Sequence, residues 1–142
     1  MDTDENCPTL TFNTIARHQS KIVRTRIASN KSPWLSMTNV GDVYSVPISH
    51  GEGRFIASDD ILKTLIENGQ VATQYADLSG NASMDIEFNP NGSVMAIEGI
   101  TSPDGRVFGK MGHAERVGKG LYKNVLGDYD IKMFASAVKY FK

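Results

Sequence analysis

Hydrophobic and polar residues alternate along two segments in the first third of the chain. Residues 23–27 are Val-Arg-Thr-Arg-Ile, and residues 44–48 are Tyr-Ser-Val-Pro-Ile. A period of two is typical of a half-buried strand, so both segments predict strands. Pro47 has no N–H to donate to a neighbouring strand. We therefore expect it at the edge of a sheet or near the end of its strand.

Two other segments have the spacing of amphipathic helices. Residues 58–68 begin with Ser58, a favoured N-cap residue, followed by two aspartates that suit the positive end of the helix dipole. Apolar residues fall on one face, and Gly69 stands where a C-terminal cap glycine is common. A second helix is expected to start near Asp128, because apolar residues then recur at helical spacing as far as Phe141.

Short strands and turns fill the middle of the chain. Strands are expected at residues 71–75, 84–88, 94–100 and 106–111. The last two predict a hairpin, because the Ser-Pro-Asp-Gly sequence between them suits a type I turn. The whole pattern predicts an α/β fold with a strand-rich mixed sheet and two main helices. Two helices are few for such a sheet, so we expect one face to be partly bare, where a missing segment or a partner would bind.

Length, charge and cysteine content narrow the class of protein. The 142 residues suffice for a domain with a core, and 40% hydrophobic with 22% charged residues is typical of a soluble globular chain. The formal net charge of −1 gives no field that favours nucleic acid or an anionic membrane. There is no apolar run of membrane-spanning length and no secretory signal pattern. The single cysteine fits a reducing compartment, so we expect a cytoplasmic protein.

A candidate base and a candidate carboxylate follow the predicted hairpin. Residues 108–117 are Phe-Gly-Lys-Met-Gly-His-Ala-Glu-Arg-Val, which places His113 two residues before Glu115. In an extended backbone these side chains point to the same side. The carboxylate could then hold one imidazole nitrogen while the other takes a proton from a thiol or hydroxyl. The spacing alone leaves two interpretations open, a catalytic dyad and a surface or loop ion pair.

A nucleophile for this base is not evident. Cys7 is followed by Pro8, which has no N–H to stabilise an oxyanion, and no helix pattern follows it. The chain also has no Gly-x-Ser-x-Gly motif. Cys7 is therefore interpreted as a bystander.

The remaining candidates lie in the loop Ser-His-Gly-Glu-Gly at residues 49–53. Glycines at Gly51 and Gly53 would let the backbone turn sharply and present N–H groups to a carboxylate. A purely structural turn, with Glu52 paired to a neighbour, is the alternative. His50 is expected to order the loop rather than act as a second base. His18 is expected to be solvated, and no spacing among the histidines predicts a metal site.

Several of these stretches together resemble a known family. The matching segments are residues 47–55, residues 89–93 with 97–101, and residues 105–116. In their order and spacing they resemble the C-terminal part of the glutaminase domain of phosphoribosylformylglycinamidine synthase. The resemblance covers nearly the whole chain. The loop at residues 31–35 and Gly112 are more similar to the large single-chain form than to the separate glutaminase subunit.

The resemblance implies a fold and a set of catalytic residues. Family members have a class I glutamine amidotransferase domain, a flavodoxin-like α/β fold with a Cys-His-Glu triad. Their histidine and glutamate correspond to His113 and Glu115. The glutamine-binding contacts would include His50, Gly51, Glu52 and Gly53. Gly112 and Ala114 stand where many members have prolines, which removes backbone stiffening but neither functional side chain.

The resemblance also implies a reaction and its partners. The parent enzyme is a ligase of purine biosynthesis that converts formylglycinamide ribonucleotide to the amidine, using ATP, magnesium and ammonia released from glutamine. The ATP and ribonucleotide sites belong to a separate synthetase region, so no cofactor is expected in this chain. Glutamine and the remainder of the synthase chain are the expected partners, and nucleic acid and membranes are not.

Residues 1–142 are therefore expected to form the C-terminal half of a class I glutaminase domain, a single incomplete domain. The nucleophilic cysteine would lie upstream of residue 1, and the isolated chain would be inactive. The alternative is a non-enzymatic binding or interaction module built on the half-fold. In either case a homodimer could cover the bare sheet face.

Overall fold

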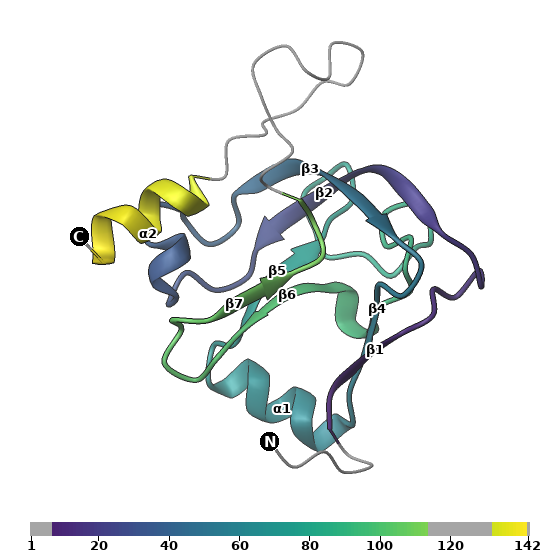
Figure 1. Ribbon diagram of the computed structural model, residues 1–142, viewed down its shortest axis with the longest axis horizontal. Helices are drawn as coiled ribbons and strands as arrows, with labels where there is room; N and C mark the ends of the chain where they lie inside the picture. The colour runs from purple at the N-terminus through teal and green to yellow at the C-terminus, as the bar shows by residue number, and fades with distance from the viewer. Residues whose placement is uncertain (1–6, 114–131, 142) are drawn as a thin grey trace.

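The computed structural model describes residues 7–113 and 132–141 (Figure 1). The strands are β1 (Thr9–Thr11), β2 (Gln19–Ile27), β3 (Val43–His50), β4 (Arg54–Ile56), β5 (Val71–Tyr75), β6 (Ile97–Thr101) and β7 (Phe108–Lys110). The helices are α1 (Asp59–Glu67), α2 (Met133–Phe141) and the short 3-10 turns η1 (Pro33–Leu35) and η2 (Val94–Ala96).

A five-stranded sheet in the order β3-β2-β5-β6-β7 forms the centre of the fold. A separate two-stranded ribbon pairs β1 with β4. The α/β class with two main helices is confirmed, but the expected mixed sheet is wrong in its pairing. Every strand pair among the described residues is antiparallel. Parallel pairs need a crossover connection, whereas the chain returns beside its own previous strand at β2–β3 and β6–β7.

The edge position predicted for Pro47 is confirmed. Pro47 lies in β3, the edge strand, opposite Ile22 of β2. Its carbonyl accepts a 2.8 Å hydrogen bond from the backbone N–H of His113. The edge of the sheet beside the proline is thus used to anchor the segment that follows β7.

Two predicted strands differ from the structure. Residues 84–88 form a turn, in which the N–H groups of Phe88 and Asn89 donate to the carbonyl of Asp85. Residues 94–96 form η2, where Met95 has φ 51° and Ala96 has φ 55°. The backbone N–H of Ala96 bonds back to Ser93, so this turn geometry delays the strand until residue 97.

The first helix agrees closely with its prediction. α1 covers Asp59–Glu67, with the two aspartates in its first turn, and Gly69 follows at φ +68°. Ser58 occupies the N-cap position, but its side chain makes no capping hydrogen bond. Leu62 and Leu65 are buried with residues of β4, β5 and β6. The start predicted for the second helix, near Asp128, lies outside the described residues.

The second helix closes the other end of the core. In Figure 1, α2 lies beside η1, and Met133 is buried with Ile27 and Leu35. Trp34 packs edge-on against Phe134, with ring centroids 6.5 Å apart, and donates its indole N–H to Arg106 O. The Trp34 loop therefore packs against the core.

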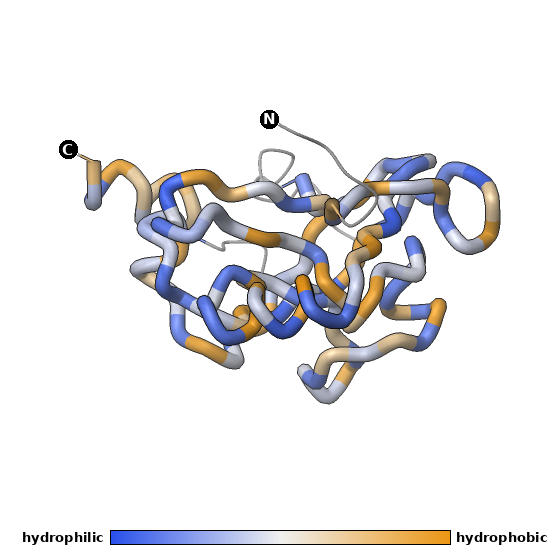
Figure 2. Tube along the Cα trace, turned by 90° about the horizontal axis from the view of Figure 1, so that it is seen from below, coloured by the Kyte–Doolittle hydropathy of each residue, from blue (hydrophilic) through white to orange (hydrophobic). Residues whose placement is uncertain are grey.

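The partly bare sheet face expected from the sequence is not found: among the described residues, the exposed large apolar side chains lie outside the strands of the five-stranded sheet. Phe12, in the segment after β1, is 67% exposed, and Val138 on α2 is 59% exposed. In Figure 2 the tube of α2, near the C-terminus, includes orange, hydrophobic residues. Whether a second copy covers any of these exposed residues stays a prediction. Among the described residues, no helix is long and apolar enough to cross a membrane.

Candidate functional site

His113 follows β7 and is held against the edge of the sheet. Its backbone N–H donates to Pro47 O at 2.8 Å. Its ring stacks on the ring of His50, with centroids 4.9 Å apart and planes inclined by 9°. The structure thus brings together two of the residues predicted for the site, from the end of β3 and the segment after β7. Glu115, the predicted partner carboxylate, lies outside the described residues.

His50 forms a second tie between these segments. Its Nε2 atom lies 2.6 Å from the backbone carbonyl oxygen of Met111. A carbonyl only accepts hydrogen bonds, so Nε2 carries the hydrogen and donates it. This contact agrees with the loop-ordering role expected for His50, while its contact with glutamine stays a prediction.

Hydrogen bonds from Asn13, a residue not predicted for the site, hold the loop at residues 50–53. Asn13 is 2% exposed; its side-chain N–H₂ donates to His50 O at 2.7 Å, and its Oδ1 accepts from the Gly53 N–H at 3.0 Å. Its backbone N–H also donates to Gly51 O. The loop conformation therefore depends on a residue nearly forty positions earlier.

The two glycines of the loop differ in how much space a side chain would have. The backbone bends at residues 51 and 52, as predicted, but neither glycine has a positive φ, so the bend does not require glycine for its dihedral angles. A Cβ on Gly53 would lie 2.5 Å from Asn91 Nδ2, so close packing excludes a side chain there. A Cβ on Gly51 would meet nothing within 4 Å. Glu52 is exposed, so residues 51 and 52 form the open part of the loop.

The turn at residues 89–93 packs beneath this loop. Asn89, Asn91 and Ser93 have no exposed surface, and Asn89 bonds to both the N–H and the carbonyl of Ser93. Ser93 Oγ accepts from Phe55 N–H and lies 3.3 Å from Gly53 O. The buried side chains of this turn therefore also support the loop at residues 50–53. The small polar residues of Asn-Pro-Asn-Gly-Ser were the available signal for this role.

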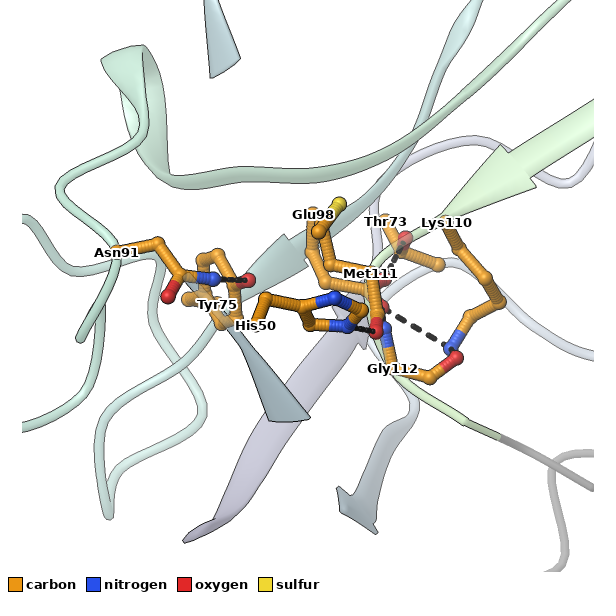
Figure 3. A network of polar contacts seen from close by, with 8 residues as sticks. All are labelled: His50, Thr73, Tyr75, Asn91, Glu98, Lys110, Met111 and Gly112. Carbon is orange, nitrogen blue, oxygen red and sulfur yellow. Dashed lines mark hydrogen bonds and ion pairs between the residues drawn. The ribbon is translucent and has the colours of Figure 1, made fainter. Parts of the chain in front are cut away.

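A buried charge lies beside the same region (Figure 3). Glu98 of β6 is 2% exposed and forms an ion pair with Lys110 of β7, with 3.0 Å between Oε1 and Nζ. Its Oε1 accepts from the Gly112 N–H at 2.6 Å, and its Oε2 accepts from the Thr73 hydroxyl. Glu98 was not among the residues predicted for the site, although a single acid within the otherwise apolar run Ala-Ile-Glu-Gly-Ile was a usable signal.

Glu98 also affects the fully buried Tyr75 of the neighbouring strand. Burial raises the pKa of the Tyr75 hydroxyl well above its usual value, and the negative charge of Glu98 raises it further. Asn91 Nδ2 donates to Tyr75 Oη at 2.9 Å and opposes part of this shift. Tyr75 is therefore a neutral hydrogen-bonding group of the core.

The other candidates lie apart from this cluster or add little to it. His18 Nε2 lies 3.0 Å from Ser49 Oγ at an exposed position, in keeping with a solvated histidine. Cys7 is half-buried and precedes Pro8, which lines a cavity of about 350 Å³ together with residues of β6 and β7. Within the described ranges, no three His, Cys, Asp or Glu side chains are grouped to hold a metal ion.

The sequence is similar to several characterised proteins. It is 40% identical over 114 residues to phosphoribosylformylglycinamidine synthase subunit PurQ of Synechocystis sp., covering 80% of this chain and 49% of the relative. It is 35% identical over 135 residues to the subunit of the same name from Methanocaldococcus jannaschii, covering 94% of this chain and 56% of the relative. The chain thus spans about half the length of these relatives.

A solved structure has the same fold. The structure of PurLQS from Thermotoga maritima matches with a TM-score of 0.71 and 27% sequence identity, covering 96% of this chain and 54% of the matched chain. The two PurQ relatives named above are separate subunits, so the expected likeness to the large single-chain form stays a prediction. The profile of the CobB/CobQ-like glutamine amidotransferase domain matches residues 1–141. The chain belongs to the CobB/CobQ-like glutamine amidotransferase domain family.

Proposed function

We propose that this chain supplies the general base of a glutaminase site in a phosphoribosylformylglycinamidine synthase. His113 is the base, and Glu115 holds its imidazole in the required orientation. The nucleophilic cysteine comes from polypeptide beyond these 142 residues, because the one cysteine of the chain is followed by Pro8, which has no N–H to donate.

The observation that carries this proposal is the double attachment of His113. Its backbone is tied to the edge strand through Pro47 O, and its ring is stacked on His50. A general base must be placed to within a fraction of an ångström of the proton it removes, and such placement needs support for both backbone and ring. A histidine of an ordinary surface loop has no need of either support.

The proposed chemistry needs one proton acceptor. His113 takes the proton of the cysteine thiol as the sulfur attacks the glutamine amide carbon. The imidazolium then returns that proton to the departing nitrogen, so ammonia leaves and a thioester remains. His113 next removes a proton from water, which attacks the thioester, and the proton passes to the sulfur as glutamate is released.

The loop at residues 50–53 is the proposed binding site for the backbone of the substrate glutamine. Asn13 holds the loop by hydrogen bonds and the side chain of Asn91 leaves no room for a Cβ on Gly53, while Gly51 leaves open space at the surface of the loop. We place the α-carboxylate of glutamine at the N–H groups of Gly51 and Glu52, which suit an anion, because the N–H of Gly53 is donated to Asn13 Oδ1. His50, whose Nε2–H is already donated to Met111 O, contributes to the shape of this site rather than to proton transfer.

The remaining parts of the reaction lie outside this chain in the proposal. ATP, magnesium and the ribonucleotide bind a synthetase region, and the ammonia formed here is consumed there. The structural similarity to PurLQS of Thermotoga maritima supports an assembly of this kind. A cytoplasmic location fits the same proposal.

Two measurements test the proposed function. In the synthase that contains this segment, Glu115→Gln should lower glutamine-dependent product formation while formation from supplied ammonia persists. Equal loss of both activities would contradict the role of Glu115. The purified 142-residue chain should release no ammonia from glutamine, and steady release that disappears on His113→Ala would show that the nucleophile lies within the chain.

A further inference from the structure

Both polar groups of the Gly112 backbone are bound by one ion pair. Its N–H donates to Glu98 Oε1 at 2.6 Å, and its carbonyl accepts from Lys110 Nζ at 3.1 Å. Glu98 and Lys110 themselves lie 3.0 Å apart, with side chains 0% and 7% exposed. The residue directly before His113 is therefore held on both sides by buried charges (Figure 3).

This ion pair is poorly explained as a device for stability. Removing two charges from water costs several kcal/mol per ion, and well-packed apolar residues of similar volume often stabilise a fold as well or better. The pair is tolerable here because each oxygen of Glu98 is hydrogen-bonded, Oε1 to Gly112 and Lys110 and Oε2 to Thr73. Charged side chains, unlike apolar ones, form directional hydrogen bonds, so they can hold a particular peptide group in one orientation.

Gly112 is adapted to this contact. A Cβ at this position would lie 2.6 Å from Val46 Cγ1, 2.8 Å from Glu98 Oε1 and 2.8 Å from Lys110 Nζ. Any side chain at position 112 would therefore displace Glu98 and Lys110. A proline would also remove the N–H from which Glu98 accepts its hydrogen bond. Because residue 112 is a glycine, its N–H is available, and Glu98 accepts a hydrogen bond from it.

We propose that Glu98 and Lys110 are positioning residues for His113, fixing the Gly112 peptide so that the imidazole is set against His50. The proposal rests on the proposed function for its catalytic meaning, since His113 is there the base. Neither Glu98 nor Lys110 touches the substrate. They act through the backbone of Gly112.

Two matched double variants isolate the hydrogen bond. Glu98→Gln with Lys110→Met removes both charges but keeps a carbonyl oxygen that can accept from Gly112. Glu98→Leu with Lys110→Met has similar volume and no acceptor. Thr73→Val is the stability control, because it removes the hydrogen bond to the other oxygen of Glu98 and leaves the Gly112 contact intact.

The first measurement is amide hydrogen exchange by NMR on the 142-residue chain. The Gly112 N–H should be protected in the wild type, in the Gln/Met variant and in Thr73→Val. In the Leu/Met variant it should exchange about tenfold faster or more, as expected for loss of a hydrogen bond to a buried acceptor. Rapid exchange of Gly112 in the wild type would overturn the proposal without recourse to any variant.

The second measurement is glutaminase kinetics in the synthase that contains this segment. The Leu/Met variant should lose about 10- to 100-fold in kcat for glutamine relative to the Gln/Met variant, as expected for a base displaced by about 1 Å. KM for glutamine should change by no more than about twofold, and synthesis from supplied ammonia should be unchanged. Equal kcat values in the two double variants would overturn the positioning role.

The two proposals can fail separately. If His113→Ala retains glutamine hydrolysis in the same synthase, the proposed function fails, and the exchange measurement still decides whether Glu98 fixes Gly112. If His113→Ala abolishes hydrolysis but the Leu/Met variant matches the Gln/Met variant, only the positioning role fails.

Discussion

The imidazole rings of His50 and His113 stack with centroids 4.9 Å apart and planes inclined by 9°. His50 lies at the end of β3, and its Nε2 is held by Met111 O at 2.6 Å. The ring of His50, on which the ring of His113 stacks, is therefore held in place by its own hydrogen bond to Met111. The orientation of the proposed base depends on a histidine that takes no part in proton transfer.

A pair of variants at His50 should separate its ring from its hydrogen bond. His50→Phe keeps a flat ring for His113 to stack on but leaves Met111 O without its donor. His50→Ala removes both. We expect glutaminase kcat to fall by about tenfold or more in His50→Ala and by clearly less in His50→Phe, because misplacement of a catalytic group is costly. A Phe variant as impaired as the Ala variant would show that stacking does not orient the base.

The two loop glycines offer a matched comparison of stability. Gly53→Ala places a Cβ 2.5 Å from Asn91 Nδ2, so a buried side chain must move, and unfolding free energy should fall by about 1–3 kcal/mol. Gly51→Ala meets nothing within 4 Å and should change stability by less than about 0.5 kcal/mol. Urea denaturation of the chain measures both.

The same pair tests the proposed glutamine contact. If the α-carboxylate binds the N–H groups of this loop, the methyl group of Gly51→Ala should raise KM for glutamine in the synthase while stability is unchanged. Unaltered KM and kcat in this variant would place the glutamine backbone elsewhere.

Tyr75 should give the chain an alkaline limit of stability. Burial and the charge of Glu98 raise the pKa of Tyr75 above the ordinary value of 10.0. The folded state therefore keeps the proton where the unfolded state releases it, so the contribution of Tyr75 is present below pH 10 and is lost as the pH rises above it. At pH 7, Tyr75→Phe should cost about 1 kcal/mol through loss of the Asn91 hydrogen bond.

Above pH 10 this difference should close and then reverse, by up to about 1.4 kcal/mol per pH unit, because phenylalanine does not ionise. Denaturation of both proteins from pH 7 to pH 11 checks the prediction. A constant difference across that range would mean that Tyr75 ionises as readily in the folded chain as in the unfolded one.

Local patterns in the sequence predicted the regular elements well. The alternation in β2 and the apolar face of α1 depend on one periodic face packing on the core, and both are found in the structure. The strand predicted at residues 44–48 is also found in β3, but all five residues are buried, so this strand is covered on both faces rather than half-buried. Residues 84–88 alternate in the same way, yet they form a turn, since Asp85 O accepts from Phe88 and Asn89. Periodicity cannot reveal such local competition for backbone hydrogen bonds.

The arrangement around His113 was only partly predictable. The resemblance singled out His113 and the loop with His50, but their stacking joins positions 50 and 113 through a sheet edge that no local pattern specifies. Asn13 and Glu98 were missed for the same reason, because their partners lie far along the chain. Polar residues buried by long-range contacts give only a weak local signal, such as one acid within an apolar strand.

The most direct test of the role of His113 compares two histidine variants in the synthase that contains this segment. His113→Ala should lower glutamine-dependent synthesis by about 10²–10⁴-fold, the usual contribution of a general base, while synthesis from supplied ammonia persists. His18→Ala, at an exposed position near Ser49, should leave both activities within about twofold of wild type. Glutamine-dependent synthesis that survives in His113→Ala at the level of the His18→Ala control would contradict the account.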